Sequence, residues 1–432
     1  MKPDITRRAV LAGLSALALP AQAKPRSNAP YVDDGVGIAQ DETFWREIQS
    51  AFTLDRTVIN LNNGGCSPTP RVVHEAFKRY LDWSNQGPPH YMWGEVEQGV
   101  EAVRRELARE AGCDPETLAI TRNASEALQI VQLGLDLQPG DEVLTTDQDY
   151  PRMLTTWAQR VKRDGIALRR VSLPTPGGAT ALASRLLNAI NHKTKVLHIS
   201  HIINVSGQIM PVAAICAEAR ARGVFCLVDG AHAFGQWPFR LDELGCDAYG
   251  TSLHKWLLAP VGTGFLHVRQ ERIPEIWPLQ PAPLSMVANI RKYEEIGTHP
   301  AANHDAIAEA LVFHRGIGGA VKAARLRYLR KRWTDAVRNH PKVQLHTSDD
   351  PALSCAIGTV GIAGKDPADL VRALWDHWRI IATPITVAPV DPTNPDAVPE
   401  PVQYAGVRVT PNIYTTLDEV DRFAEALLSL AA

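Results

Sequence analysis

The chain has 432 residues and a formal net charge of −2, with 45 Lys and Arg against 47 Asp and Glu. A chain of this length exceeds what one hydrophobic core accommodates, so we expect two domains. The charged fraction of 21% is close to that of an average globular protein. The composition therefore gives no support to a nucleic-acid partner or to binding at a membrane surface.

The first 23 residues have the pattern of a twin-arginine signal peptide. Residues 6–11 contain Arg7 and Arg8, an apolar stretch runs from Ala9 to Leu19, and small residues end at Ala23. The apolar stretch is about half as long as a bilayer span, so we expect cleavage rather than anchoring. The expected outcome is a periplasmic chain without a membrane span, exported by the twin-arginine translocase. The alternative is an N-terminal tail with a chance pair of arginines.

The six cysteines show no spacing typical of a disulfide framework or a zinc site. Twin-arginine export carries folded proteins, and a chain that folds in the cytoplasm starts with reduced thiols. We therefore predict mostly free cysteines.

Strand-like runs alternate with helical patterns through the middle of the chain. The strand-like runs are Leu118–Thr121, Glu142–Thr145, Val196–Ile199, Val224–Val228 and Gly264–Val268. Helical patterns separate them, as in residues 94–111 and 212–222. Such alternation predicts a mostly parallel sheet with helices on both faces. Ligands of such sheets bind at the carboxyl ends of the strands.

The sequence pattern changes after about residue 310. Residues 310–337 predict one long helix or a broken pair, followed by short strands near 356–362 and 406–410 and a last helix over 417–430. A proline-rich stretch from Ala388 to Pro401 predicts a long loop. We therefore divide the chain into a signal peptide (1–23), an N-terminal segment (24–59), a large domain (60–309) and a small domain (310–432).

An acid and a lysine follow two of the strands in the large domain. Asp229 ends the apolar run that starts at Val224. Lys255 lies just past the strand that is expected next in the chain. This is the arrangement of a pyridoxal phosphate (PLP) site. The lysine forms a Schiff base with the cofactor aldehyde, and the acid keeps the pyridine nitrogen protonated so that the ring accepts electrons from a carbanion. The alternative for Lys255 is a surface lysine in a loop.

Residues after the first strand predict a cradle for the cofactor phosphate. Asn123, Ala124 and Ser125 open a helix, where backbone N–H groups and the Ser125 hydroxyl would bind an anion. An ordinary helix cap is the competing interpretation. Ser252 and His254, which flank Leu253 just before the lysine, are further candidate phosphate donors.

Polar side chains after the other strands complete the predicted cofactor site. The ring of Tyr150 would stack on the cofactor ring, although a surface turn explains its position equally well. Asn204 would hydrogen-bond the cofactor's phenolic oxygen. His232 would donate to the phosphate or orient Asp229, with a structural role as the alternative, and His201 is assigned a structural role.

Taken in chain order, these motifs resemble fold-type I PLP enzymes of the class V aminotransferase superfamily, and most of all its isopenicillin N epimerase-like branch. The matching segments are residues 61–65, 121–127, 147–150, 204–207, 228–232, 252–256, 297–298 and 408–410. The resemblance implies an α/β fold: a large PLP-binding domain with a mostly parallel seven-stranded sheet, and a smaller α+β C-terminal domain.

The resemblance also implies a homodimer, because Gly297 and Thr298 would reach the cofactor phosphate of the partner subunit. Arg408 would bind a substrate carboxylate, a role that suits a bidentate guanidinium; a strand-edge charge is the alternative.

For the substrate entrance, the same resemblance assigns Asn62, Asn63 and Gly64 as lining residues. Cys355 precedes a predicted strand and no cysteine follows it, so the persulfide chemistry of cysteine desulfurases is disfavoured.

The reaction itself stays open between several outcomes. Lys255 would take the α-proton of an amine substrate, with Tyr150 and Asp229 as the other catalytic residues. Transamination, epimerisation and β-elimination (C–S lyase chemistry) all begin in this way. Export favours a peptide, a siderophore precursor or another amino-acid-derived amine as substrate. The competing classes are an exported, non-catalytic PLP- or ligand-binding homologue and a nicotinamide dehydrogenase; no G-x-G-x-x-G supports the dehydrogenase.

Overall fold

The computed structural model describes residues 36–388 and 402–432. Its large domain is built on a seven-stranded sheet with the order β2-β8-β7-β6-β5-β3-β4. The strands are β2 (Leu118–Thr121), β3 (Glu142–Thr146), β4 (Ala167–Val171), β5 (Thr194–Ser200), β6 (Phe225–Asp229), β7 (Ala248–Ser252) and β8 (Gly264–Val268). Only β8 is antiparallel to its neighbours, β2 and β7, so the carboxyl ends of the other six strands meet at one edge. The predicted mostly parallel, seven-stranded sheet is confirmed.

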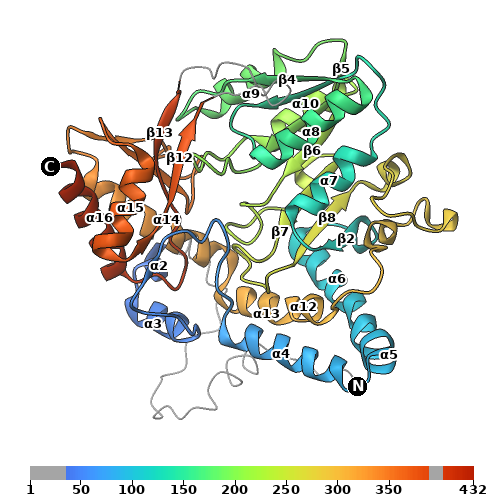
Figure 1. The fold of residues 1–432 in the computed structure, drawn as a ribbon, viewed down its shortest axis with the longest axis horizontal. Helices are drawn as coiled ribbons and strands as arrows, with labels where there is room; N and C mark the ends of the chain where they lie inside the picture. Colours follow the sequence, from blue (N-terminus) through green and yellow to red (C-terminus); the bar gives the residue numbers. More distant parts are fainter. Residues whose placement is uncertain (1–35, 389–401) are drawn as a thin grey trace.

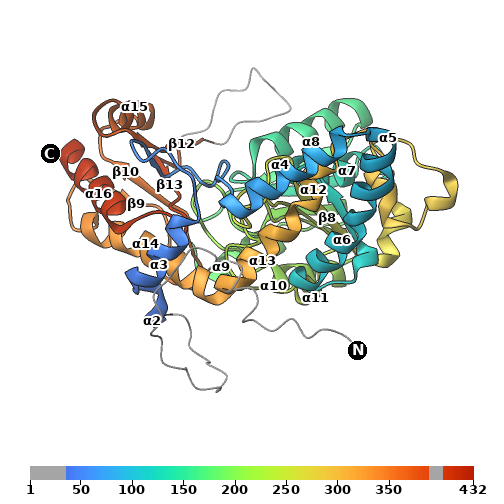
Figure 2. The same cartoon turned by 90° about the horizontal axis from the view of Figure 1, so that it is seen from below.

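Helices cover both faces of this sheet (Figure 2). One face packs against α7 (Ala124–Gly134) and α8 (Pro151–Asp164), whose apolar residues share a core with residues of the sheet. The other face packs against α6 (Glu97–Ala111), α9 (Ala179–Leu187), α10 (Val212–Ala221) and α11 (Leu241–Leu244). Burial of both faces explains why the central strands have nearly continuous apolar sequences.

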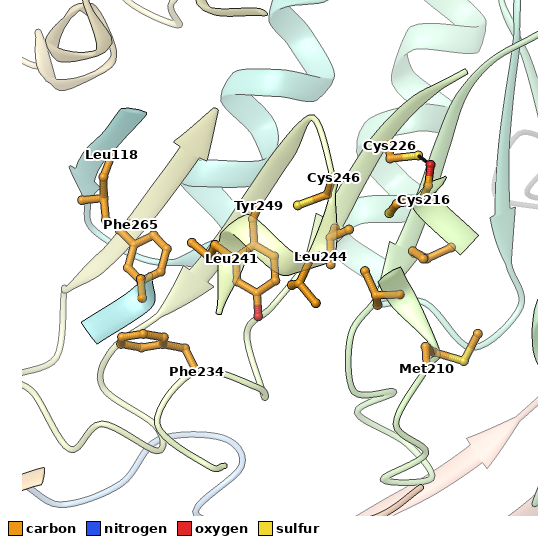
Figure 3. Packing of buried hydrophobic residues seen from close by; sticks show 14 of the residues in the cluster. Leu118, Met210, Cys216, Cys226, Phe234, Leu241, Leu244, Cys246, Tyr249 and Phe265 are labelled. Carbon is orange, nitrogen blue, oxygen red and sulfur yellow. Dashed lines mark hydrogen bonds between the residues drawn. The ribbon is translucent and has the colours of Figure 1, made fainter. Parts of the chain in front are cut away.

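Three cysteines belong to the second of these cores (Figure 3). Cys216, Cys226 and Cys246 are buried among apolar side chains, and the Cys226 thiol lies 3.9 Å from the Cys216 carbonyl oxygen. All six cysteines lie within the described residues and are free thiols, as predicted. The contact with Cys226 and burial raise the pKa of the Cys216 thiol well above its usual value, so these thiols act as small apolar side chains.

The small domain contains a four-stranded sheet with the order β12-β13-β10-β9 (Figure 1). Its strands are β9 (Val343–Leu345), β10 (Gly358–Ile362), β12 (Thr383–Val387) and β13 (Tyr404–Val409). Three helices pack on it: α14 (Gly319–Val337), α15 (Pro367–Trp378) and α16 (Leu417–Ala431). The last of these begins with a capping box between Thr416 and Glu419.

The boundary between the domains differs from the predicted one in two places. The predicted division at residue 310 falls inside α13 (Ile307–Ile317), and Ala310 and Leu311 belong to the core of the large domain. Gly318, with a φ of 92°, separates α13 from α14, so of the two alternatives predicted for residues 310–337 the broken pair is confirmed. At the other end, β1 (Ile59–Asn60) pairs with β11 (Ile380–Ile381), so this strand joins the small domain.

The remaining elements connect these layers. They are α2 (Val36–Ala39), α3 (Glu42–Ser50), α4 (Arg71–Asn85), α5 (Pro88–Tyr91), the π-helix η1 (Met92–Val96), the 3-10 helices η2 (Pro115–Thr117), η3 (Gln270–Glu275), η4 (Leu284–Met286) and η5 (Ile290–Glu294), and α12 (Ala302–Asp305). In Figure 1, α4, α12 and α13 run along the lower edge of the molecule. No helix within residues 36–388 and 402–432 is both long and apolar enough to cross a bilayer.

One strand of the large sheet, β4, was not predicted from the sequence. It forms an edge, is only half-buried, and contains Arg169 and Arg170, so it lacks an apolar run. The strand expected between Asp229 and Lys255, whose bounds the sequence did not define, is β7; it has the sequence AYGTS, in which only Tyr249 is large, although every residue is buried. The predicted proline-rich loop from Ala388 to Pro401 lies almost entirely outside the described residues.

Candidate active site

A cavity of about 330 Å³ lies at the carboxyl edge of the large sheet. This volume is at the lower end of the range for small-ligand pockets, about 300–1,000 Å³. Ten residues predicted from the sequence line it: Asn123, Ala124, Ser125, Tyr150, Asn204, Asp229, His232, Ser252, His254 and Lys255. They follow five different strands, because the carboxyl ends of parallel strands share one edge. Gly297 and Thr298 are exposed and are not among the lining residues.

Asp229 is buried at the end of β6, where one carboxylate oxygen accepts a hydrogen bond of 2.9 Å from the Ala231 amide. The second oxygen accepts no hydrogen bond from any described residue. Burial raises the pKa of the carboxyl group to about 6, against the opposing effect of that amide and of Lys255. Asp229 is therefore a buried acid that a cationic group in the cavity would stabilise.

The glycine after Asp229 is required by its neighbour rather than by a ligand. A Cβ at Gly230 would lie 2.0 Å from the ring of Tyr249, which packs under the loop. The Tyr249 hydroxyl in turn lies 3.2 Å from His201 Nδ1. His201 is buried, and burial lowers its pKa to about 3, so its neutral ring has the structural role that was predicted.

Lys255 faces the cavity, and its amine lies 3.2 Å from His232 Nε2. Burial lowers the pKa of the Lys255 ammonium to about 8, while Asp229 acts in the opposite direction. Burial and the neighbouring charges of Lys255 and Arg408 hold the pKa of His232 well below its usual value. The neutral imidazole thus accepts from the lysine, and its Nδ1 has no partner among the described residues. No hydrogen bond joins His232 to Asp229 among the described residues, and the predicted contact of His232 with the phosphate stays a prediction.

The first turn of α7 presents an anion-binding surface to the cavity. The Asn123 side chain caps the helix by accepting from the Glu126 amide, so for this side chain the ordinary-cap interpretation is right. The Ala124 amide donates to the Ser252 hydroxyl at 2.9 Å. Between them, the Ser125 amide has no acceptor among the described residues, and Ser125 lines the cavity. An anion at this helix N-terminus would satisfy that amide.

Tyr150 caps α8 and reaches the cavity, with 36% of its surface exposed. Its position is fixed by Asp149, which sequence reasoning passed over. The Asp149 carboxylate accepts five hydrogen bonds of 2.7–2.9 Å from Thr145, Thr146 and Ser200. These bonds join the carboxyl ends of β3 and β5, so Asp149 stabilises the edge from which Tyr150 projects.

Arg408 lies at the end of β13, in the small domain, and only 7% of it is exposed. Its guanidinium donates to Asn62 Oδ1 at 2.9 Å and to the Asn204 carbonyl oxygen at 3.3 Å. No carboxylate among the described residues pairs with it, and its Nε has no partner. Burial lowers the pKa of Arg408 to about 10. A buried cation without a counter-ion is costly, and a ligand carboxylate would offset that cost.

The Asn62–Gly64 segment divides into residues with different roles. Asn62 Oδ1 accepts from both Arg408 and the Thr383 hydroxyl, at 2.9 and 2.7 Å, so Asn62 positions the guanidinium. Asn63 is fully buried, and its amide donates to the Thr410 carbonyl oxygen at 2.8 Å. The predicted place of Asn63 at the substrate entrance is therefore wrong, because its hydrogen bonds hold the loop from within. The Gly64 amide donates to the Thr410 hydroxyl at 2.9 Å.

Two residues near the site gave no usable signal in the sequence. Thr383 comes from an edge strand of the small domain, and its hydrogen bond with Asn62 joins residues that are 321 positions apart in the chain. Cys66 is an exposed thiol next to Gly65, a cavity-lining residue, and its sulfur lies 3.7 Å from the His254 carbonyl oxygen. Burial around the sulfur raises the pKa of Cys66, and Lys255 acts in the opposite direction.

The residues present fit pyridoxal phosphate. The free Ser125 amide suits its phosphate, Asp229 suits its pyridine nitrogen, and the Lys255 amine suits its aldehyde. Asn204 Oδ1 is buried and has no hydrogen-bond partner among the described residues. It could therefore accept a hydrogen bond from a donor on the cofactor or the substrate. His254 directs its Nδ1 to the Thr263 carbonyl oxygen at 3.2 Å, so this nitrogen does not serve the phosphate.

Comparison with known proteins gives the same assignment. A model of the aminotransferase class-V family matches residues 59–423. The chain is 33% identical over 404 residues to an isopenicillin N epimerase from Streptomyces clavuligerus, covering 89% of this chain and 98% of that protein. It is 30% identical over 409 residues, 90% of this chain and 99% of the relative, to an isopenicillin N epimerase from Amycolatopsis lactamdurans.

Solved structures show the same fold at lower identity. A cysteine desulfurase from Thermococcus onnurineus NA1 matches with a TM-score of 0.75 and 22% identity, over 89% of this chain and 98% of that chain. A mutant of C-DES with glycine covalently linked to its PLP cofactor matches with a TM-score of 0.73 and 24% identity, over 87% and 99%. The chain belongs to the aminotransferase class-V family and is a fold-type I enzyme that uses pyridoxal phosphate.

Proposed function

We propose that this enzyme epimerises the α-carbon of an amino-acid-derived substrate that carries a free amine and a free carboxylate. The observation that carries the proposal is the buried Arg408, which lacks an acidic partner among the described residues and adjoins the cavity that holds Lys255. The full-length similarity to two isopenicillin N epimerases supports epimerisation over transamination. Both reactions begin with removal of the α-proton, so transamination is the second candidate.

Substrate binding would use the small domain. The Arg408 guanidinium is held from one side by Asn62 and Asn204, which leaves its Nε for a substrate carboxylate. A charge-assisted, bidentate contact to a carboxylate fixes both position and orientation. The α-carbon of a substrate held in this way would lie between the small domain and Lys255.

Proton removal would use Lys255. Bound PLP withdraws electrons from the substrate α-carbon through its pyridine ring, which Asp229 keeps protonated. The lowered pKa of Lys255 means that its amine loses its charge more easily than an exposed lysine, as a general base requires. The neutral His232 beside it accepts from the amine and so orients it.

Epimerisation requires a second group that returns a proton to the other side of the α-carbon. We assign this role to Tyr150, which lines the cavity and lies close enough to Arg408 to affect its pKa. The phenol hydroxyl of a tyrosine can act as a general acid. The stacking role expected for its ring is compatible with this assignment.

C–S bond cleavage is a competing function because Cys66 offers an exposed thiol beside the cavity. Cys355, by contrast, is fully buried, and its sulfur contacts the carbonyl oxygens of Gln236 and Ala323 at 3.9 Å. This leaves Cys66 as the thiol to test. A non-catalytic PLP-binding role would leave Arg408, which has no acidic partner in the described part of the chain, without a purpose.

A homodimer completes the proposed site. Gly297 and Thr298 are exposed and lie away from the cavity of their own chain. We assign them to the cofactor phosphate of the partner subunit, in line with the resemblance to class V enzymes.

We also propose periplasmic localisation by twin-arginine export, which suits a substrate such as a secreted peptide or a siderophore precursor. The signal region falls in residues 1–35, outside the described part of the chain, so the support is the sequence pattern alone. Cell fractionation of the full chain and of a variant with Arg7 and Arg8 changed to Lys tests this. If the chain is exported by this route, processed enzyme appears in the periplasm for the wild type and not for the variant. Wild-type enzyme that stays in the cytoplasm would contradict the proposed export.

The type of reaction can be determined by incubating the enzyme in D₂O with a panel of substrates and following exchange of the α-proton. The panel contains amino acids, and peptides that carry a free α-amino group at the N-terminus or on a side chain. Epimerisation predicts α-deuterium together with inverted configuration and no 2-oxo acid. Tyr150→Phe should keep exchange but lose inversion by about a hundredfold, because one of two proton carriers is removed. Formation of a 2-oxo acid that requires an added 2-oxo acid as amino acceptor would establish transamination. Release of pyruvate, ammonia and sulfide from cysteine would establish β-elimination, and conversion of cysteine to alanine with transfer of its sulfur to Cys66 would establish desulfurase-type C–S cleavage.

Asp229→Asn should retain bound cofactor but lose turnover by roughly a hundredfold, since a neutral amide cannot stabilise the pyridinium charge. Cofactor content by absorbance, the thermal unfolding temperature and the exchange rate would be measured on the same preparation. Near-normal exchange in this variant would mean that another residue meets the ring nitrogen.

Arg408→Ala should lower kcat/KM for carboxylate-bearing substrates about thirtyfold and leave their decarboxylated amine analogues almost unaffected. Removing one partner of a desolvated charge pair costs about 2 kcal/mol or more. Arg332→Ala, which removes an exposed ion pair with Asp421 in the same domain, serves as the control. An equal loss for acids and simple amines would make Arg408 a structural residue.

A further inference from the structure

Lys322 is a fully buried lysine that the reaction described above does not use. It lies in the first turn of α14, and its ammonium donates to the carbonyl oxygen of Trp256. No carboxylate among the described residues pairs with it. Burying an unpaired amine in a protein core is unfavourable, and burial lowers the pKa of Lys322 to about 7. Its hydrogen bond to the Trp256 carbonyl oxygen is therefore the interaction that indicates its role.

That contact is made to the residue directly after Lys255. The chain turns sharply here: Leu258 has a φ of 67°, in the left-handed region that leucine rarely adopts, and the Ala259 amide donates to the Leu253 carbonyl oxygen at 3.1 Å. A Cβ at Gly235 would lie 2.7 Å from the Leu257 amide nitrogen, so the turn packs directly on neighbouring backbone. The Trp256 carbonyl oxygen accepts none of the hydrogen bonds within this turn, and it accepts one from Lys322 instead.

The other ionisable groups around Lys322 already have partners. Glu110 pairs with Arg315 at 2.7 Å and lies 3.5 Å from His314 Nε2. Burial lowers the pKa of His314, and Lys322 adds to that effect. Cys355 also affects the pKa of Lys322. It is a buried thiol, and burial raises its own pKa. These groups give Lys322 no counter-ion, so its hydrogen bond to Trp256 is the specific interaction.

Helix α14 also connects this contact to the small domain. Its later residues Leu329 and Trp333 pack in the small-domain core together with Val407 and Val409, the neighbours of Arg408 on β13. One helix therefore contacts the turn that carries Lys255 and supports the strand that carries Arg408.

We propose that Lys322 is a positioning residue, which fixes the Lys255 turn relative to the small domain by holding the Trp256 carbonyl. The inference rests on the proposed role of Lys255 as the residue that bonds the cofactor. It predicts that loss of the Lys322 hydrogen bond loosens the attachment of PLP without altering any group that touches the cofactor.

The test compares Lys322→Met with Lys322→Gln in the purified holoenzyme. The two replacements have similar size, but only glutamine donates a hydrogen bond. Lys292→Met is the matched control, because Lys292 is a second buried lysine that donates to backbone carbonyls, those of Ile273 and Val287 at 2.6 and 2.9 Å. The release rate of PLP after dilution is followed by absorbance, alongside the thermal unfolding temperature.

The proposal requires about tenfold faster PLP release from Lys322→Met, the order expected when a buried carbonyl loses its donor. Lys322→Gln should recover most of the wild-type rate, and Lys292→Met should lower the unfolding temperature but not change release. Wild-type release from Lys322→Met, equal release from the Met and Gln variants, or equally fast release from Lys292→Met would each overturn it.

The role of Lys255 is checked separately. Borohydride reduction of the holoenzyme followed by peptide mapping should place the cofactor on Lys255. A label on another lysine would overturn the proposed site, whereas a label on Lys255 with unchanged release from Lys322→Met would overturn only the positioning role.

Discussion

The active site depends on the burial of ionisable groups that the protein does not neutralise by itself. Asp229, Lys255 and Arg408 face or adjoin one cavity, and burial moves the pKa of each group toward its uncharged form, to about 6, 8 and 10. A cationic ring nitrogen, an aldehyde and a carboxylate would each relieve one of these costs. Perturbed groups gathered in one cavity are a physical sign of function rather than of stability.

The fold supplies the geometry that keeps these groups together. Parallel strands place five loop starts at one edge of the sheet, and Asp149 ties two strand ends together there through five hydrogen bonds. Arg408, to which we assign the substrate carboxylate, belongs to the small domain because β13 carries it. The relative position of the two domains therefore sets the distance between the Lys255 amine and the Arg408 guanidinium.

Most of the fold was predictable because its signals are local. Strands β2, β5, β6 and β8 each contain a run of buried apolar residues, and the helical stretch over residues 310–337 shows its break at Gly318. Strand β4 was not predictable, because its charged residues are tolerated at a sheet edge. Strand β7 was expected from its place between Asp229 and Lys255, but its bounds were not, because its short sequence has little intrinsic preference for a strand.

The sequence by itself determined the α/β class and the identity of the residues that line the cavity. Each of these residues lies at or just after the carboxyl end of a strand, and that end fixes its position in the fold. The tertiary structure decided what those residues bond to. Asn63 turned inward, Asn62 and Thr383 came together on Arg408, and Lys322 reached Trp256. Such contacts join segments far apart in the chain, and they form only when the tertiary structure brings these segments together, which no local pattern encodes.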